Sequence, residues 1–208
     1  MLSVFSSLYA GNLLYYSTIL RSEFIQIDLF ENYQKQSYRN RCSIASPNGV
    51  LNLVIPINRK SKSIIKEVKI DDSQNWRKIH WKSLESAYRS SPYFEFYEDK
   101  LNTIFFKQNC NYLFEFNHFI LIEVLKALKV ETQVTFTDYY ISSGKEINDF
   151  KNLTHPKAPI GNNLKQLKYN QVFQEKQKFI PNLSILDLLF NEGPMARQFL
   201  MKLNNYKH

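Results

Sequence analysis

Two β-type segments, 38–45 and 50–57, flank the turn Ser46-Pro47-Asn48-Gly49. Proline fixes φ early in such a turn and glycine accepts a positive φ after it. We therefore predict that the two segments fold back on each other as an antiparallel hairpin.

The first strand of this hairpin carries two arginines where a fold needs only apolar and polar alternation. Successive side chains of a strand point to opposite faces. The alternation predicts a core-like face with Tyr38, Asn40, Cys42 and Ile44, and an opposite face with Arg39, Arg41 and Ser43.

The remaining segments set the order of elements. Apolar and β-branched content predicts strands at 2–8, 24–30, 64–70 and 133–137, and helical spacing predicts helices at 76–90, 93–106, 111–129, 184–193 and 195–204. The stretch 141–168 is polar and rich in lysine, and is interpreted as a loop. Strands, then helices, then an isolated strand predict a single domain over 1–208, of the α/β or α+β class, with a mixed, partly antiparallel sheet packed by several helices.

Composition fits a globular chain with one core. The 208 residues are 44% hydrophobic and 15% aromatic, and a chain of this length buries roughly 70% of its unfolded surface. The net charge of +8 comes mainly from scattered lysines, so it is a weak indication of nucleic-acid binding, and nucleic acid is not expected as a partner. Anionic small molecules, such as phosphates or sugar nucleotides, fit the charge equally well.

Several classes of protein are not expected. No apolar run is long enough to span a membrane, the start of the chain lacks the charged region of a secretory signal, and the two cysteines have no metal-ligand spacing. We expect a cytoplasmic protein without a metal or cofactor. The chain has no GxxxxGK[ST], GxGxxG, HExxH or GxSxG motif, and with 5 glycines a backbone cradle for phosphate is not expected. Side chains must then supply the donors for an anion.

Arg39 and Arg41 are the first candidates, because a planar guanidinium grips phosphate or carboxylate through two parallel hydrogen bonds. The alternative is two surface arginines on the solvent side of the hairpin. Asn40, on the opposite face, must bond to backbone or to a ligand if it is buried.

His80 is the candidate base. It lies four residues after Trp76 on one helix stripe, and a neutral imidazole can accept a proton near pH 7. A packed core histidine is the alternative. Tyr93, in Ser91-Pro92-Tyr93-Phe94, either stacks on a sugar or base or forms a helix junction.

In this order, several motifs together resemble the WbqC-like protein family, in a compact, Bacteroidetes-type form. They are Glu31-x-Tyr33-Gln34-Lys35-Gln36-Ser37-Tyr38-Arg39-Asn40-Arg41-Cys42, Pro47-Asn48-Gly49, Val54-x-Pro56, Trp76-x-x-x-His80-Trp81, Ala87-Tyr88, Ser91-Pro92-Tyr93-Phe94 and the run from Asn182 to Asn191. The strongest blocks lie at 31–101 and 169–195.

The resemblance implies a bacterial protein from the context of surface-polysaccharide and O-antigen loci. It supports functional roles for Tyr38, Arg39, Asn40, Arg41, Trp76, His80, Pro92 and Tyr93, which occupy matching positions. The resemblance implies that larger members of the family carry His-Gln-Pro after the first strand, whereas this chain has Ser6-Ser7-Leu8-Tyr9 there. If that histidine is catalytic, this chain binds the same class of ligand without turnover.

Two hypotheses result. The first is a transferase-like enzyme of surface-polysaccharide or sugar-nucleotide metabolism, in which Arg39 and Arg41 hold an anion, His80 moves a proton, and Trp76 and Tyr93 wall the acceptor. The second is a non-catalytic scaffolding or interaction protein of the same pathway. The sequence does not predict an oligomeric state.

Overall fold

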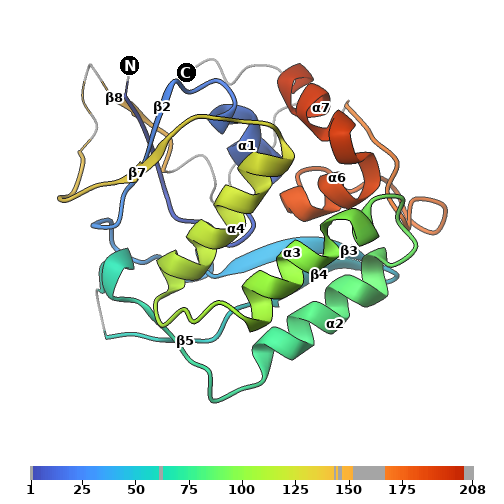
Figure 1. Ribbon diagram of the computed structural model, residues 1–208, viewed down its shortest axis with the longest axis horizontal. Helices are drawn as coiled ribbons and strands as arrows, with labels where there is room; N and C mark the ends of the chain where they lie inside the picture. Colours follow the sequence, from blue (N-terminus) through green and yellow to red (C-terminus); the bar gives the residue numbers. More distant parts are fainter. Residues whose placement is uncertain (1, 61–62, 143, 145–146, 152–166, 204–208) are drawn as a thin grey trace.

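A parallel sheet of four strands lies at one side of the molecule. The computed structural model describes residues 2–60, 63–142, 144, 147–151 and 167–203 (Figure 1). The strand order is β7-β2-β1-β8, with β1 at Leu2–Phe5, β2 at Phe24–Ile27, β7 at Val134–Phe136 and β8 at Ile147–Asp149. All three pairings are parallel. Because parallel strands need a crossover, the helix α1 (Leu13–Ile19) connects β1 to β2.

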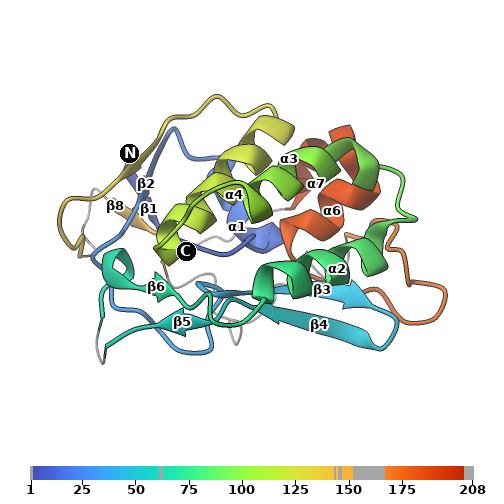
Figure 2. The ribbon, with the colours of Figure 1, turned by 60° about the horizontal axis from the view of Figure 1, so that its bottom comes forward.

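The predicted hairpin forms a separate layer. Strand β3 (Arg41–Ser46) pairs with β4 (Gly49–Val54) in antiparallel register, and Gly49 has a φ of +108° in the turn. The short strands β5 (Ile57–Asn58) and β6 (Lys69–Ile70) form a further antiparallel pair. Figure 2 shows the hairpin and this pair below the helices.

The larger helices lie above the hairpin layer and to one side of the parallel sheet (Figures 1 and 2). They are α2 (Trp76–Tyr88), α3 (Phe94–Phe106), α4 (Leu113–Ala127), α6 (Ile185–Glu192) and α7 (Ala196–Lys202), with 3-10 turns η1 (Ile65–Glu67) and η2 (Gly193–Met195). Ser184 accepts a hydrogen bond from the Leu186 amide, which begins α6 as its capping pattern predicts.

One continuous core joins these layers. Rings from different elements meet in it: Phe105 of α3 and Phe116 of α4 lie 5.3 Å apart between centroids, and Trp76 of α2 lies 5.2 Å from Phe116. Buried side chains from the parallel sheet, the hairpin and all the larger helices belong to the same cluster. In the described part of the chain, no helix has the length and apolar character to cross a membrane.

The mixed α/β class is confirmed, but the strands do not form one mixed sheet. The predicted strand at 64–70 is wrong, because 65–67 form the 3-10 turn η1 and only Lys69–Ile70 pair as a strand. The first two strands also end earlier than predicted, at Phe5 and Ile27. Strand β8 lies within the segment predicted as loop, most of which is outside the described residues.

The hairpin strand begins at Arg41, three residues later than predicted. Within β3 the alternation holds, since Cys42 and Ile44 are buried and Arg41 and Ser43 are partly exposed. Arg39 precedes the strand, in a turn, and is only 3% exposed. The prediction that Arg39 shares the outer face with Arg41 is therefore wrong.

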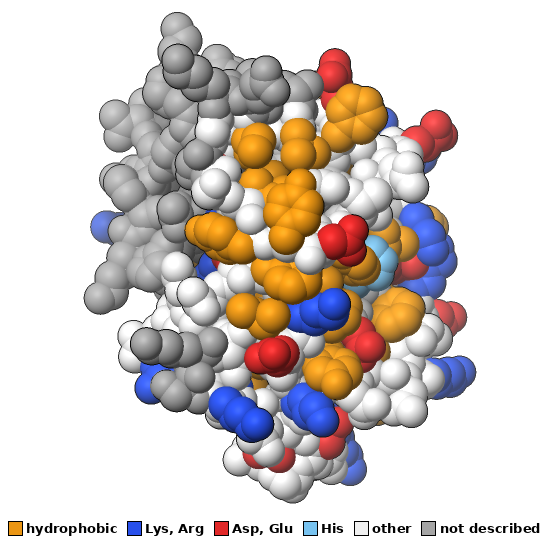
Figure 3. Space-filling model, turned by 90° about the vertical axis from the view of Figure 1, so that its left-hand side faces the viewer, with side chains coloured by type: hydrophobic (Ala, Val, Ile, Leu, Met, Phe, Trp, Pro, Cys, Tyr) orange, Lys and Arg blue, Asp and Glu red, His pale blue; other side chains and the backbone are white. Residues whose placement is uncertain are grey.

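The side of the molecule that carries the parallel sheet has a mixed surface. Figure 3 shows hydrophobic side chains gathered on this face, with most lysine and arginine side chains toward its lower part and right-hand edge. Around the sheet, Phe24 on β2 and Tyr139 and Tyr140 after β7 are among the exposed large rings.

Candidate anion-binding site

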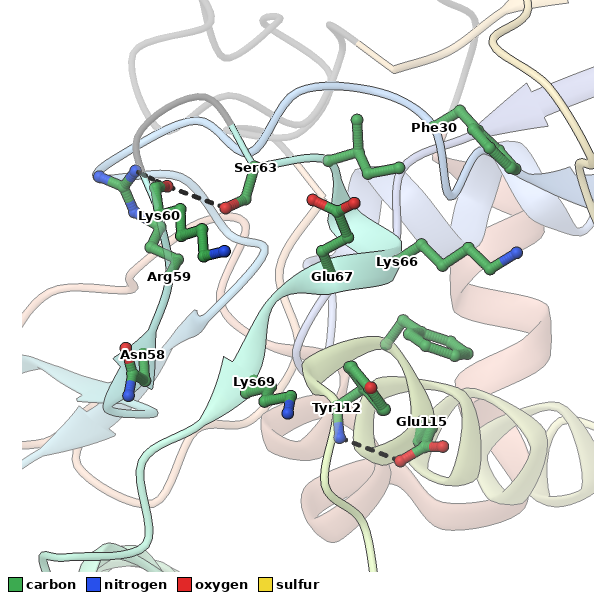
Figure 4. A pocket seen from close by; sticks show the side chains of 12 residues that line it. Phe30, Asn58, Arg59, Lys60, Ser63, Lys66, Glu67, Lys69, Tyr112 and Glu115 are labelled. Carbon is green, nitrogen blue, oxygen red and sulfur yellow. Dashed lines mark hydrogen bonds between the residues drawn. The ribbon is translucent and has the colours of Figure 1, made fainter.

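A cavity of about 820 Å³ opens between the segments around η1 and the start of α4. This volume lies within the range of known ligand pockets, roughly 300–1,000 Å³. Four cationic and two acidic side chains take part in its lining, which consists of Phe30, Asn58, Arg59, Lys60, Ser63, Ile64, Lys66, Glu67, Lys69, Tyr112, Phe114 and Glu115 (Figure 4). We name this cavity the basic pocket.

Backbone hydrogen bonds hold the wall of the basic pocket from both sides. The segment 63–69 lies between the chain after β2 and the start of α4. On one side the Lys66 amide donates to the Leu29 carbonyl at 2.9 Å, and on the other the Leu113 amide donates to the Val68 carbonyl at 2.9 Å. The pocket wall is thus part of the fold, and its side chains start from fixed backbone positions.

The cations of the pocket lie over aromatic rings. The Lys66 Nζ lies 5.2 Å from the ring centroid of Phe30, and the Lys69 Nζ lies 5.7 Å from that of Tyr112. These are cation–π distances, which hold an ammonium group without neutralising its charge. The positive charge of both lysines therefore remains available to an anion.

The two carboxylates of the pocket have different environments. Glu115 Oε2 accepts hydrogen bonds from the Asn111 and Tyr112 amides, both at 3.0 Å, and so caps the start of α4. Glu67 is exposed on η1 and forms no ion pair with a described residue. Cationic groups thus dominate the charge of the pocket.

Sequence reasoning missed this site. The basic stretch 58–63 suggests a solvated loop, and Lys66 and Lys69 fall in a segment that the sequence predicts as a strand. The recurrence of basic residues at 59, 60, 66 and 69 was the available signal. Its meaning depends on Phe30 and Tyr112, which are distant in sequence and only the fold brings near.

Arg41 is the predicted ligand-binding residue whose side chain is least engaged. It forms no hydrogen bond or ion pair within the described residues, and its Nε is buried there without a partner. Its charge acts on the nearby phenols of Tyr33 and Tyr38. Burial raises the pKa of both phenols, and the charge of Arg41 offsets part of that rise. A buried, unbonded N–H is rare in folded proteins and calls for an explanation.

Asn40 and Tyr38 lie beside Arg41 and have internal partners. The Asn40 Oδ1 accepts from the Tyr33 hydroxyl at 2.8 Å, and its Nδ2 donates to the Ile55 carbonyl at 2.8 Å. The Tyr38 hydroxyl, which is half-buried, interacts with the side chains of Asn12 and Ser43. Asn40 is therefore satisfied by the protein, and its bond to Ile55 joins it to the residue that follows β4.

Arg39 is engaged in a buried ion pair. Its Nε donates to Glu31 Oε1 at 3.0 Å and its Nη2 to Glu31 Oε2, while further donors reach Ser6 Oγ and Gln34 Oε1 at 3.2 Å. Burial raises the pKa of Glu31, and the Arg39 guanidinium opposes that rise. All three nitrogens of the Arg39 guanidinium thus donate to groups of the protein itself rather than to a ligand.

His80 lies in the core, on the inner side of the hairpin. Its Nδ1 is 3.0 Å from the Tyr9 hydroxyl, and its ring also bonds to the backbone of Val54. Burial lowers its pKa to about 4. The ring is neutral at pH 7 and 4% exposed, so in this conformation a substrate does not reach it. Its catalytic role stays a prediction.

Trp76 and Tyr93 also lie at packing positions. Trp76 is 2% exposed, packs on His80 with centroids 5.1 Å apart, and donates from Nε1 to Asp72 Oδ1 at 2.8 Å. Tyr93 begins α3, its amide donates to the Phe190 carbonyl at 3.0 Å, and its ring lies against Gly193. Trp76 and His80 are thus in contact, whereas the contacts of Tyr93 join α3 to the end of α6.

A second group of buried charges lies at the carboxyl ends of the parallel strands. Lys151 Nζ, after β8, donates to Asp28 Oδ2, after β2, at 2.9 Å, and Ser6, after β1, bonds to the Lys151 carbonyl at 3.3 Å. Open α/β sheets bind ligands at this edge. Here each charge already has an opposite partner, so the edge is closed by ion pairs. The described residues contain no group of three or more His, Cys, Asp or Glu that could hold a metal ion.

Comparisons with known proteins agree with the resemblance of the sequence motifs. The model of the WbqC-like protein family matches residues 9–158 and 157–199. The chain is also 29% identical, over 204 residues, to the uncharacterized protein Rv1507c of Mycobacterium tuberculosis (strain ATCC 25618 / H37Rv), covering 86% of this chain and 87% of the relative. No solved structure matches. The family match spans most of the chain, and the protein therefore belongs to the WbqC-like protein family.

Proposed function

We propose that the protein binds a phosphate-bearing small molecule of the sugar-nucleotide class in the basic pocket, and acts on it as a transferase of bacterial surface-polysaccharide or sugar-nucleotide metabolism. The observation that carries this proposal is the placement of Lys66 and Lys69 over the rings of Phe30 and Tyr112 at one cavity. Ammonium groups attract phosphate, and aromatic rings stack on a sugar or a base. Both properties occur at one opening of suitable volume.

The chemistry of the pocket suits recognition by side chains. The chain has 5 glycines, and none of those that the structure describes lines the pocket, so flexible cations replace a backbone cradle. Lysine contacts phosphate as a point charge, without the fixed geometry of a fork. We therefore expect binding to depend strongly on ionic strength and weakly on the shape of the phosphate group.

Calorimetric titration with UDP-glucose and with inorganic pyrophosphate tests this proposal. Lys66→Ala and Lys69→Ala should each weaken binding about three- to tenfold at low salt, that is by about 0.7–1.4 kcal/mol. The effect should shrink as salt rises, because screening acts on exposed charges.

The matched control is Lys82→Ala, an exposed lysine on α2 outside the pocket lining. Equal effects of Lys66→Ala and Lys82→Ala would mean that only the overall charge attracts these probes. The absence of any binding by the unmodified protein would also reject the proposal.

The burial of His80 favours a second candidate function, a non-catalytic binding protein of the same pathway. Its ring is neutral at pH 7, lies within hydrogen-bond distance of the Tyr9 hydroxyl through Nδ1, and is only 4% exposed. Complementation of a strain that lacks the gene separates the two functions. A folded His80→Gln variant that restores the surface polysaccharide supports the binding protein, and loss of the polysaccharide with the fold intact supports the enzyme.

A further inference from the structure

Arg41 and Arg59 both act on the same side chain, Tyr33. The Arg59 guanidinium carbon lies 5.0 Å from the ring centroid of Tyr33. The Tyr33 hydroxyl donates to the side chain of Asn40, which neighbours Arg41 in the chain; burial raises the pKa of Tyr33, and the charges of Arg59 and Arg41 both oppose that rise. Tyr33 is thus close enough to both guanidinium groups, which come from different parts of the chain, to respond to their charge.

Neither arginine is neutralised. No described carboxylate forms an ion pair with Arg41 or Arg59. Among the described residues, Arg59 donates only to the carbonyl of its neighbour Lys60, at 3.3 Å, and the Arg41 Nε is buried without a partner. Two uncompensated guanidinium groups near one tyrosine repel each other, and an anion that lies near both relieves the repulsion.

Arg39 shows what a compensated arginine looks like in the same chain. It reaches Glu31, Ser6 and Gln34 and is fully enclosed. The protein therefore supplies an internal anion for one arginine of the Arg-Asn-Arg stretch and leaves the other open. That difference separates a structural arginine from one with donors available to a ligand.

The Arg41 and Arg59 pair adjoins the basic pocket. Arg59 itself lines the pocket, and the Tyr33 amide donates to the carbonyl of Ser63, another lining residue, at 3.0 Å. Both links are fixed by the fold.

We propose that Arg41 and Arg59 form, around Tyr33, an oxyanion subsite at the edge of the basic pocket. The inference rests on the proposed function and deepens it. The ligand carries two anionic groups, one held by the lysines of the pocket and one by the two arginines. The second group is a further phosphate or a carboxylate, since a guanidinium fork binds either.

Two pairs of probes distinguish these sources. UDP and UMP differ by one phosphate, and UDP-glucuronate and UDP-glucose differ by one carboxylate. The unmodified protein should bind the more charged member of one pair about tenfold more tightly. Arg41→Ala and Arg59→Ala should abolish that advantage, whereas Lys66→Ala should weaken both members of the pair alike.

Control variants distinguish the effect of the planar guanidinium from the effect of its charge, and both from a loss of folding. Arg41→Lys keeps the charge but loses the planar fork, and should recover only part of the advantage. Arg197→Ala, at an exposed arginine of α7, should leave it unchanged. Thermal unfolding of each variant verifies that the fold is intact.

Different results identify different failures. Suppose that Lys66→Ala weakens probe binding, but Arg41→Ala leaves the preference for the more charged probe unchanged in both pairs. This result would overturn the arginine subsite while the basic pocket stands. If no probe binds, the pocket fails, and labelling with phenylglyoxal then decides the subsite. Arg41 should react where the enclosed Arg39 does not, and inorganic phosphate should protect it; labelling of Arg41 that phosphate does not slow would overturn the proposal.

Discussion

Asp187 is a fully buried carboxylate that is bonded to hydroxyl groups rather than to a cation. Its Oδ1 accepts from the Tyr88 hydroxyl at 2.7 Å, and its Oδ2 from the Tyr169 hydroxyl at 2.5 Å. Burial raises the pKa of Asp187 to about 6. In the unfolded chain an aspartate has a pKa of about 3.9. The folded protein thus binds this proton more tightly than the unfolded chain.

This difference predicts the sign of a pH effect on stability. The contribution of Asp187 is fully present below pH 4 and is lost as the pH rises through 6. Its upper size is roughly 3 kcal/mol. Asp187→Asn should therefore flatten the fall in the free energy of unfolding between pH 4 and pH 6, measured by urea titration. Unchanged pH slopes in the variant would contradict this assignment.

His80 should act in the opposite direction over the same pH range. Its pKa is lowered to about 4 by burial, so the unfolded chain binds the proton more tightly. The stability that it contributes is present above pH 6.5 and is lost as the pH falls through 4. His80→Gln should reduce the acid sensitivity of unfolding, whereas Asp187→Asn should increase it. A shift of the same sign in both variants would show that these sites do not control the profile.

The Glu31 and Arg39 pair gives a prediction of a different kind. Removing one partner leaves a charge buried alone, which costs about 3–5 kcal/mol. Arg39→Met and Glu31→Leu should each destabilise the fold by about that amount, and the double variant should recover most of the loss. Denaturant titration of the three variants measures the coupling. Additive losses would mean that the two side chains act independently.

At the scale of elements, the end of α6 depends on Gly193. This residue has a φ of +49°, and a Cβ there would lie 2.5 Å from the ring of Tyr93. Both the backbone conformation and the close ring disfavour a side chain. Gly193→Ala should lower the free energy of unfolding by more than about 1 kcal/mol. The matched control is Gly144→Ala, where no described residue lies within 4 Å of an added Cβ, and an equal loss there would argue against a specific contact.

Elements with local signals could be predicted from the sequence. The Pro-Asn-Gly turn predicts the hairpin, and the Ser184 cap and Gly193-Pro194 predict the ends of α6. The segment 64–70 could not, because its apolar residues point inward from a 3-10 turn and the residues after it, which backbone bonds to Leu29 and Leu113 hold in place. Arg39 escaped prediction for a related reason, since a turn, rather than a strand, sets its direction.

At the scale of the whole molecule, the sheet and the candidate site depend on contacts between distant segments. The parallel pairing of β1 with β8 has no local turn signal in the sequence. Strand β8 is only three residues long and lies among polar residues, so its apolar alternation is too short to predict a strand. The basic pocket likewise combines Phe30, the segment 58–69 and the start of α4. Of the predicted site residues, Arg41 keeps an unengaged guanidinium, while Arg39, Trp76 and His80 are enclosed.

The late position of β8 has a consequence for synthesis on the ribosome. Strand β1 is made first, yet one of its two neighbours in the sheet is made only with residues 147–149. Until then, β1 has an unpaired edge that other nascent chains can join. The hairpin and the three helices that follow it contain mostly local contacts and can form early. The edge of β1 is thus open to misassembly while the hairpin and the helices are made, until residues 147–149 pair with it.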